Sequence, residues 1–233
     1  IVGTLPTPRD EDLVALDLRT PEPWSLVHEG VALHGHFMRP RAHDPDKRYP
    51  LVWMVYGGPG VQTVLDRWSP RPLWQHLADR GFFVAQLDNR GTSGRGPAVS
   101  GAIHGRLGDV ELRDQIAGLE NLLSNEPTID GDRVGIYGHS YGGYLAARAL
   151  MTHPGVFRAA ASGSPVTDWA LYDTGYTERF MRAPADNPRG YQAASLLDKV
   201  DEMRGSLMLL HGLMDENVHF EHTGKLADAL VAA

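Results

Sequence analysis

Residues 133–144, RVGIYGHSYGGY, decide the fold of this chain. Residues 133–138 predict a buried strand, and the small and apolar residues 142–154 predict a helix that follows it at once. Between them, residues 138–142 read G-x-S-x-G. In this strand–turn–helix context a serine sits on a sharp, strained turn, with its hydroxyl above the sheet and a helix N-terminus beneath it. We therefore predict that Ser140 is a nucleophile, the alternative being a plain Gly-Ser turn.

Further strand and helix patterns lie on both sides of this stretch. Predicted strands occupy 31–38, 51–56, 82–88, 158–166 and 206–212, and predicted helices occupy 72–81, 109–125 (with Asp109 as N-cap) and the chain from about residue 221. Their alternation indicates right-handed crossovers and a mostly parallel, doubly wound α/β sheet with helices on both faces. Ligands of such sheets bind beyond the carboxyl ends of the strands. Four loops are predicted to meet there: 57–60, 138–143, 164–176 and 211–217.

An acid follows the predicted strand 206–212 after one short loop. Asp215 lies downstream of Ser140, which matches the chain order nucleophile, acid, histidine of the α/β-hydrolases. A carboxylate there would orient and stabilise an imidazole. The neighbouring Glu216 is the alternative acid, and a helix-capping turn is the non-catalytic alternative. On this basis residues 1–50 are a lead-in with the first strands, and residues 51–233 are an α/β-hydrolase catalytic domain.

The turn after the strand 51–56 is a candidate oxyanion loop. It reads YGGPG (56–60), and acyl transfer needs hydrogen-bond donors aimed at the developing oxyanion. The backbone N–H of Tyr141, directly after the nucleophile, is one predicted donor, and a group from 56–60 is the other. The alternative is a plain glycine turn.

A base for this constellation is not found among the histidines. Only His219 and His222 follow Asp215, and they lie at the start of a predicted helix. The fold still requires that helix, of about 10–12 residues, and a strand of about 5–6 residues before the loop that carries the base. We therefore expect the base beyond Ala233, so that the C-terminal part of the fold is missing. His219 and His222 are expected to be surface residues or, in one case, a pocket wall.

Composition excludes several classes of function. The net charge of −7 and the scattered Lys and Arg give no reason to expect nucleic acid or an anionic membrane as partner. The absence of cysteine excludes a thiolate metal site and a cysteine nucleophile. No apolar run approaches the length of a membrane span. HGH (34–36) places two imidazoles on one strand face, but an exposed strand explains them better than a metal site, and we expect no cofactor. The stretch 1–12 is interpreted as the edge of a longer protein.

Six segments together resemble a known family. They are VYGGPG (55–60), LDNRGTSGRG (87–96), HGRLGDVELRDQ (104–115), YGHSYGGY (137–144), SPVTDWALYDTGYTERFM (164–181) and HGLMDENVHF (211–220). Their order and spacing resemble the prolyl oligopeptidase family of serine peptidases, and its dipeptidyl-peptidase IV branch in particular. The resemblance runs from about residue 50 to the C-terminus.

The resemblance implies a role for each matching residue. Ser140 would be the nucleophile, Asp215 the triad acid, and the Tyr56 hydroxyl an oxyanion donor beside the Tyr141 amide. An apolar pocket for proline or alanine would be lined by Val166, Trp169, Tyr172, Tyr176 and Tyr141, and Asn217 would contact the substrate carbonyl. Flat, rigid aromatic walls suit a pyrrolidine ring. Without the resemblance, core packing would be the preferred explanation of residues 169–176.

The expected function is that of a serine exopeptidase that releases dipeptides after a penultimate proline or alanine. Alternatives are an acylaminoacyl peptidase, an oligopeptidase or an esterase of the same fold, or a truncated domain that binds peptides without cleaving them. Family members carry an N-terminal β-propeller, near which acidic residues hold the free amino group of the substrate, and they often dimerise. Nothing in these residues corresponds to the propeller, and the sequence does not decide the compartment. We expect residues 1–233 alone to be inactive and, with sheet edge exposed, prone to aggregate.

Overall fold

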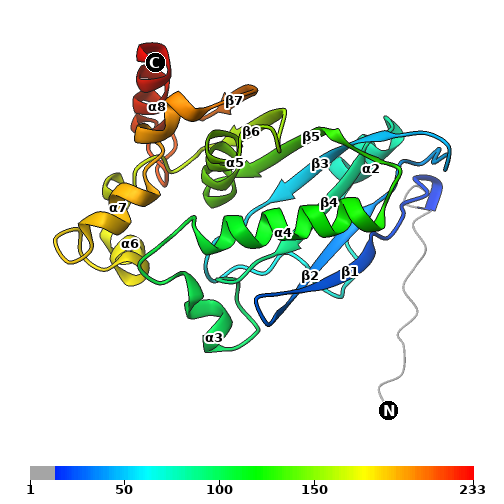
Figure 1. Ribbon diagram of the computed structural model, residues 1–233, viewed down its shortest axis with the longest axis horizontal. Coiled ribbons are helices and arrows are strands. Elements are labelled where there is room, and N and C mark those ends of the chain that lie inside the picture. Colours follow the sequence, from blue (N-terminus) through cyan, green and yellow to red (C-terminus); the bar gives the residue numbers. More distant parts are fainter. Residues whose placement is uncertain (1–13) are drawn as a thin grey trace.

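One mixed sheet organises the molecule, and the computed structural model describes it within residues 14–233 (Figure 1). Its strands are β1 (Glu22–His28), β2 (Val31–Met38), β3 (Tyr49–Val55), β4 (Phe83–Asp88), β5 (Ile129–His139), β6 (Ala159–Gly163) and β7 (Ser206–Leu210). Their order is β1-β2-β4-β3-β5-β6-β7. Strands β3 to β7 pair in parallel, whereas β2 pairs antiparallel with both β1 and β4. The stretch 1–12, interpreted above as an edge, lies outside the described residues.

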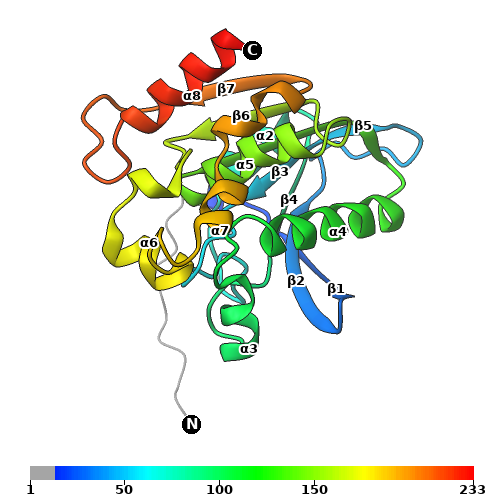
Figure 2. The same ribbon diagram turned by 60° about the vertical axis from the view of Figure 1, so that its left-hand side comes forward.

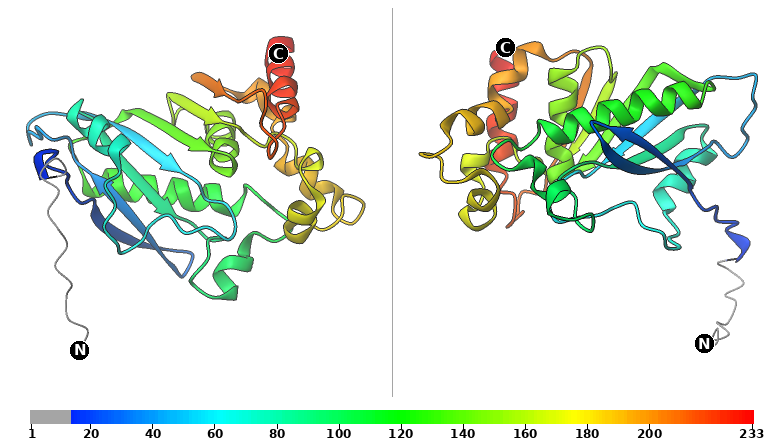
Figure 3. Two further views of the ribbon diagram at one scale, coloured as in Figure 1. Left: turned by 180° about the vertical axis from the view of Figure 1, so that it is seen from behind. Right: turned by 60° about the horizontal axis from the view of Figure 1, so that its bottom comes forward.

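Helices cover both faces of this sheet. α4 (Val110–Asn125) and α5 (Tyr141–Thr152) lie on one face, and α2 (Pro72–Asp79) lies on the other (Figures 1 and 3). The remaining helices are α3 (Pro97–Ser100), α6 (Thr174–Met181), α7 (Pro188–Ala194), α8 (Glu221–Ala232) and the short 3₁₀ helices η1 (Gly101–Ile103), η2 (Trp169–Leu171) and η3 (Leu197–Glu202). Figure 2 shows α6 and α7 together below α8 at one end of the sheet. The predicted α/β-hydrolase architecture is confirmed.

The two faces of the sheet have separate cores. On the α4 and α5 side, Trp53, Ile136 and Leu145 are fully buried members of the larger cluster. On the other side, Met54 and Val84 pack against Trp74 of α2 in a smaller cluster. Burial on both faces explains why β3 and β4 are rich in apolar residues without strict alternation.

Two local expectations differ from the structure. β1 was not predicted, because EPWSLVH mixes proline and charge with few apolar residues. It forms as an edge strand, and Trp24 lays its ring over Gly35 of β2, where any side chain would collide with it.

Asp109 occupies the N-cap position of α4, but its side chain makes no capping bond. Instead the backbone N–H of Gly108 donates to the carboxyl of Glu111 at 3.0 Å.

β7 forms the other edge of the sheet and is incompletely covered. Met208 and Leu210 on this strand are 54% and 47% exposed. They border an open hollow of about 720 Å³ that also touches Met54, Leu73 and Leu77.

Among the described residues, no helix is long and apolar enough to cross a membrane.

Candidate active site

Ser140 lies on a strained turn between β5 and α5. Its φ and ψ are 59° and −120°, which is unusual for a residue with a side chain. The strain is held in place on both sides, because its N–H donates to the Gly163 carbonyl at 2.8 Å and its carbonyl accepts from the Tyr144 N–H at 3.0 Å. The structure therefore places Ser140 at the sharp strand-to-helix turn that the sequence predicts.

Glycine is required on each side of Ser140 by close backbone approach. A Cβ at Gly138 would lie 2.2 Å from the Gly142 carbonyl oxygen, and a Cβ at Gly142 would lie 2.1 Å from the Val55 carbonyl oxygen. Real Cβ atoms do not approach backbone so closely. The G-x-S-x-G pattern is thus explained by the packing of β3, β5 and α5 around the serine.

Asp215 belongs to the loop between β7 and α8. One carboxylate oxygen accepts the backbone N–H groups of Asn217 and Val218, both at 3.0 Å. Burial raises the pKa of Asp215, but these two bonds and one from the Ser164 hydroxyl outweigh it, so the pKa lies below its ordinary value. The carboxylate is therefore ionised at neutral pH. Glu216, the alternative acid, is exposed to solvent.

The second oxygen of Asp215 faces an imidazole, although this is not a free base. His211 Nε2 lies 3.5 Å from this oxygen. The same nitrogen donates to the Val218 carbonyl at 2.7 Å, and Nδ1 pairs with the Thr223 hydroxyl at 2.7 Å. Both ring nitrogens of His211 are thus occupied in holding the acid loop against α8. Within residues 14–233, no histidine is hydrogen-bonded to Ser140.

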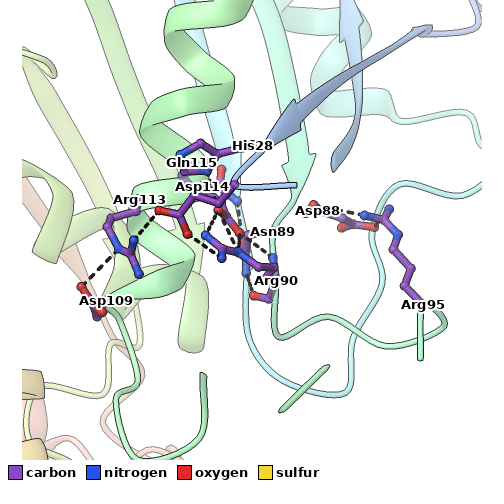
Figure 4. A network of polar contacts seen from close by, with 10 residues as sticks. His28, Asp88, Asn89, Arg90, Arg95, Asp109, Arg113, Asp114 and Gln115 are labelled. Atoms are coloured by element: carbon purple, nitrogen blue, oxygen red, sulfur yellow. Dashed lines mark hydrogen bonds and ion pairs between the residues drawn. The ribbon is translucent and has the colours of Figure 1, made fainter. Parts of the chain in front are cut away.

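The turn 56–60 is anchored by two polar side chains, Asn89 directly after β4 and Gln115 of α4, which are drawn in Figure 4. The Asn89 amide donates to the Gly57 carbonyl at 2.9 Å, and Gln115 donates to Asn89 at 2.7 Å. Gln115 in turn accepts from the Trp53 indole at 2.7 Å. This chain of bonds fixes the turn that carries Tyr56.

A second part of the same network ties the β4 exit to the β1–β2 hairpin (Figure 4). Asp114 is fully buried, and its carboxylate accepts the backbone and guanidinium N–H groups of Arg90 and pairs with His28 at 2.8 Å. Hydrogen bonding to Asp114 raises the pKa of Arg90 above its ordinary value. The network is a scaffold, because it holds the loop after β4 without reaching the cavity beside Ser140.

A small cavity of about 80 Å³ opens beside Ser140. It is lined by Tyr56, Ser140, Tyr141, Val166, Trp169, Tyr172, Tyr176 and Asn217. These residues follow β3, β5, β6 and β7, so side chains distant in the sequence meet at the carboxyl ends of the parallel strands. The structure thus brings together all the predicted site residues except Asp215, which lies two positions from Asn217 in the same loop.

Aromatic rings give this cavity rigid walls. Trp169 and Tyr176 are stacked with ring centroids 6.2 Å apart, and Tyr172 stands edge-on to both, at 5.9 Å and 5.4 Å. Tyr141 approaches Trp169 to 5.2 Å from the other side. The Tyr172 hydroxyl donates to the Asn217 side-chain oxygen at 2.7 Å. This bond joins the aromatic wall to the loop between β7 and α8 that carries Asp215.

The tyrosines of the cavity keep their protons at neutral pH. Burial raises the pKa of Tyr56, with a smaller contribution from Tyr172. Burial likewise raises the pKa of Tyr172 and of Tyr176. The phenols therefore present O–H donors, which is what stabilisation of an oxyanion requires.

Of the two histidines after Asp215, His222 is the one that supports a pocket wall, and it is not a surface residue. It is only 1% exposed, and its Nδ1 accepts the Thr167 N–H at 3.1 Å. Burial lowers the pKa of His222 to about 4, so the ring is neutral. It lies behind Tyr172, with centroids 6.5 Å apart, and so supports the pocket wall. His219, in contrast, is exposed as expected.

Two residues near the site escaped the sequence analysis. Glu111 of α4 accepts a hydrogen bond from the Tyr141 hydroxyl, and the Ser164 hydroxyl at the exit of β6 helps to lower the pKa of Asp215. A charged residue on the buried face of α4 is the one signal in the sequence that points to Glu111.

No group of three or more metal-ligating side chains occurs among the described residues. The two imidazoles of HGH differ in exposure, since His34 is exposed and His36 is half-buried.

Comparison with known proteins places this geometry in a family. Residues 68–233 match the Prolyl oligopeptidase family. The chain belongs to the prolyl oligopeptidase family of serine peptidases. Over 223 residues it is 44% identical to dipeptidyl peptidase 8 of Mus musculus, with 93% of this chain and 25% of that protein covered.

Two further proteins are similar to this chain over most of its length. The chain is 36% identical over 197 residues to a probable dipeptidyl peptidase 4 of Aspergillus clavatus, with 82% of this chain and 26% of that protein covered. The crystal structure of a putative dipeptidyl aminopeptidase IV from Bacteroides ovatus matches with a TM-score of 0.89 and 34% identity, over 92% of this chain and 31% of that one. The chain thus spans about a quarter of the length of the curated relatives.

Proposed function

We propose that this chain is catalytic-domain sequence of a serine exopeptidase that releases dipeptides after a penultimate proline or alanine. The observation that carries the proposal is the convergence of the strained Ser140 turn and the aromatic cage on one small cavity. Family membership supports a serine nucleophile, and the names of the relatives support dipeptide release.

In this mechanism Ser140 attacks the carbonyl of the penultimate substrate residue. A histidine located beyond Ala233 takes the serine proton and delivers it to the leaving amine as the peptide bond breaks, which leaves the dipeptide as an ester on Ser140. Water, deprotonated by the same histidine, then attacks this ester, and the dipeptide leaves as Ser140 regains its proton. Asp215 orients that histidine, because one of its oxygens is held by backbone amides while the other stays available. The Tyr56 hydroxyl and the Tyr141 amide stabilise the oxyanion of the tetrahedral intermediate. The proposal requires no metal or organic cofactor.

The cavity provides the specificity. Its rigid rings and Val166 enclose about 80 Å³, which suits a pyrrolidine ring or a methyl group and excludes a large side chain. Asn217, oriented by its bond to Tyr172, contacts the substrate carbonyl. The groups that hold the free amino terminus of the substrate lie outside residues 1–233 in this proposal.

The test uses the full-length protein that contains this sequence. Matched substrates carry a free N-terminus, a blocked N-terminus or an ester, each with proline or leucine at the penultimate position. We expect cleavage of the free-amino proline substrate and its loss in Ser140→Ala. Val166→Phe fills the cavity, so it should abolish that cleavage while a small fluorophosphonate still labels Ser140.

Other outcomes would identify the competing functions. Cleavage confined to blocked or ester substrates would favour an acylaminoacyl peptidase or esterase. Binding of peptides without phosphonate labelling of Ser140 would favour a domain that binds and does not cleave. Either result contradicts the proposed dipeptide release.

A further inference from the structure

Glu111 is a buried acid directly behind the candidate site. It lies in the first turn of α4 and is fully buried. One carboxyl oxygen accepts two hydrogen bonds, from the Tyr141 hydroxyl at 2.5 Å and from the Gly108 N–H at 3.0 Å. The other oxygen is buried without a hydrogen-bond partner among the described residues. The carboxyl is therefore committed to Tyr141 on one side and left unsatisfied on the other.

No ion pair accounts for an acid at this position. Of the charged groups around Glu111, Arg148 of α5 is the one that influences its carboxyl. Arg148 directs its own donors elsewhere, to the carbonyls of Gly108 and Ala193, both at 2.9 Å. The other titratable groups that face Glu111 are phenols, Tyr141 and Tyr144 of α5 and Tyr176 of α6. Burial raises the pKa of Glu111 to about 7.

Burying this carboxyl is costly, and packing does not require it. A leucine of similar size would fill the same space without an unsatisfied oxygen. What leucine lacks is an acceptor for the Tyr141 hydroxyl, which lies in a residue that is 2% exposed. The bond to Tyr141 is therefore the feature that distinguishes Glu111 from a packing residue.

Tyr141 joins two parts of the candidate site. Its backbone N–H directly follows Ser140 at the start of α5, and its ring lines the cavity at 5.2 Å from Trp169. The ring also lies against Gly58 of the oxyanion turn, where a Cβ would come within 2.7 Å of it. A hydrogen bond that fixes the phenol consequently fixes the cavity wall and restrains the amide beside the nucleophile.

We propose that Glu111 is a positioning residue of the site, which holds the Tyr141 phenol and thereby sets the cavity wall and the adjacent backbone amide. This inference rests on the proposed function, since it assigns no chemistry to Glu111 itself. Glu111 acts on the reaction through Tyr141 and does not touch the substrate.

The test compares Glu111→Gln, Glu111→Leu, Tyr141→Phe and the double variant of the last two in the full-length protein. Glutamine keeps an acceptor for the phenol, leucine removes it, and phenylalanine removes the donor. We expect Glu111→Leu and Tyr141→Phe each to lower the second-order rate of phosphonate labelling of Ser140 and kcat/KM by about tenfold, the equivalent of one buried hydrogen bond. In Glu111→Gln both rates should stay within about threefold of the wild-type rates. The double variant should lose no more of either rate than the less active of the two single variants.

Tyr144→Phe is the matched control. Its hydroxyl is also buried on α5 and donates to the Leu107 carbonyl at 3.1 Å, but it does not line the cavity. It should lower the melting temperature without changing the labelling rate per folded molecule. If Glu111→Leu does not fold, Tyr141→Phe tests the same bond from the other side.

The outcomes separate this inference from the proposed function. Normal labelling rates in Glu111→Leu or Tyr141→Phe, or equal losses in Glu111→Gln and Glu111→Leu, would overturn the positioning role. Wild-type protein that is labelled but does not release dipeptides would overturn the proposed specificity, and the labelling rates would still decide the role of Glu111. Wild-type protein that is not labelled at all would overturn both.

Discussion

Replacing Glu111 by glutamine should change how the stability of the protein depends on pH. Burial raises the pKa of Glu111 to about 7 from an ordinary value of 4.5. Between these two pH values the carboxyl is protonated in the folded protein and ionised in the unfolded chain. The folded state therefore binds more protons, so this group lowers the free energy of unfolding as the pH rises through the window, and its effect levels off above pH 7.

The size of the effect follows from the difference between the two pKa values. Going from 4.5 to about 7, at about 1.4 kcal/mol for each pH unit, the wild type loses about 3 kcal/mol of stability that glutamine, which does not titrate, does not lose. The buried amide of glutamine adds a cost of its own through its unpaired N–H groups. That cost is the same at every pH, so the slope rather than the absolute stability carries the prediction.

Urea unfolding followed by tryptophan fluorescence at several pH values between 4.5 and 8 measures this slope. The difference in unfolding free energy between Glu111→Gln and wild type should rise by about 3 kcal/mol across the window, because all other titrating groups cancel in the difference. Glu120→Gln, an exposed change on the same helix, is the control and should give a constant difference. A constant difference for Glu111→Gln as well would refute the argument that burial controls this carboxyl.

Three further predictions concern the elbow, the oxyanion turn and the scaffold. Gly142→Ala forces a Cβ to 2.1 Å from the Val55 carbonyl oxygen, so it should lower the free energy of unfolding by more than about 3 kcal/mol in thermal unfolding. Gly224→Ala on α8, where a Cβ meets open space, should instead raise it by up to about 1 kcal/mol. Equal effects of the two substitutions would contradict the packing argument. Tyr56→Phe should lower kcat about 100-fold with little change in KM, and a change in KM alone would exclude an oxyanion role. Asp114→Asn removes the buried charge that holds the half-buried Arg90 guanidinium and should cost about 2 kcal/mol in urea unfolding. A loss below about 0.5 kcal/mol would show that the network is not a scaffold.

Local patterns predicted the parallel part of the fold well. β3 and β4 are predominantly apolar runs followed by glycine or polar turns, and β5 ends in the short stretch VGIYG before the serine turn. Apolar runs of this kind have few alternatives in an α/β protein with helices on both faces of its sheet. β1 could not be predicted, because Trp24 is stabilised there by a contact with Gly35 that no local pattern shows. Asp109 takes the expected N-cap position of α4, but its side chain does not cap the helix, because Glu111 turns back and accepts the Gly108 N–H at the same helix end.

The residues of the candidate site likewise differ in how far local sequence patterns could predict them. Ser140 and Asp215 could be identified because each follows a recognisable strand within a few residues, and the aromatic residues were named through family resemblance. The sequence left open which of His219 and His222 would stand at a pocket wall, and only the structure shows that the loop after β6 folds over His222 and buries its ring.

By itself, the sequence determined the strands and crossover helices of the parallel part of the sheet and the strained serine turn, since these depend on residues that are neighbours along the chain, and it determined the family through six short segments that each keep their local pattern. Only the tertiary structure decided that the exits of β3, β5, β6 and β7 enclose one small cavity, and that a buried carboxyl stands behind Tyr141. The reason is physical: burial and the raised pKa of Glu111 arise from segments that are far apart in sequence and meet only when the sheet is assembled.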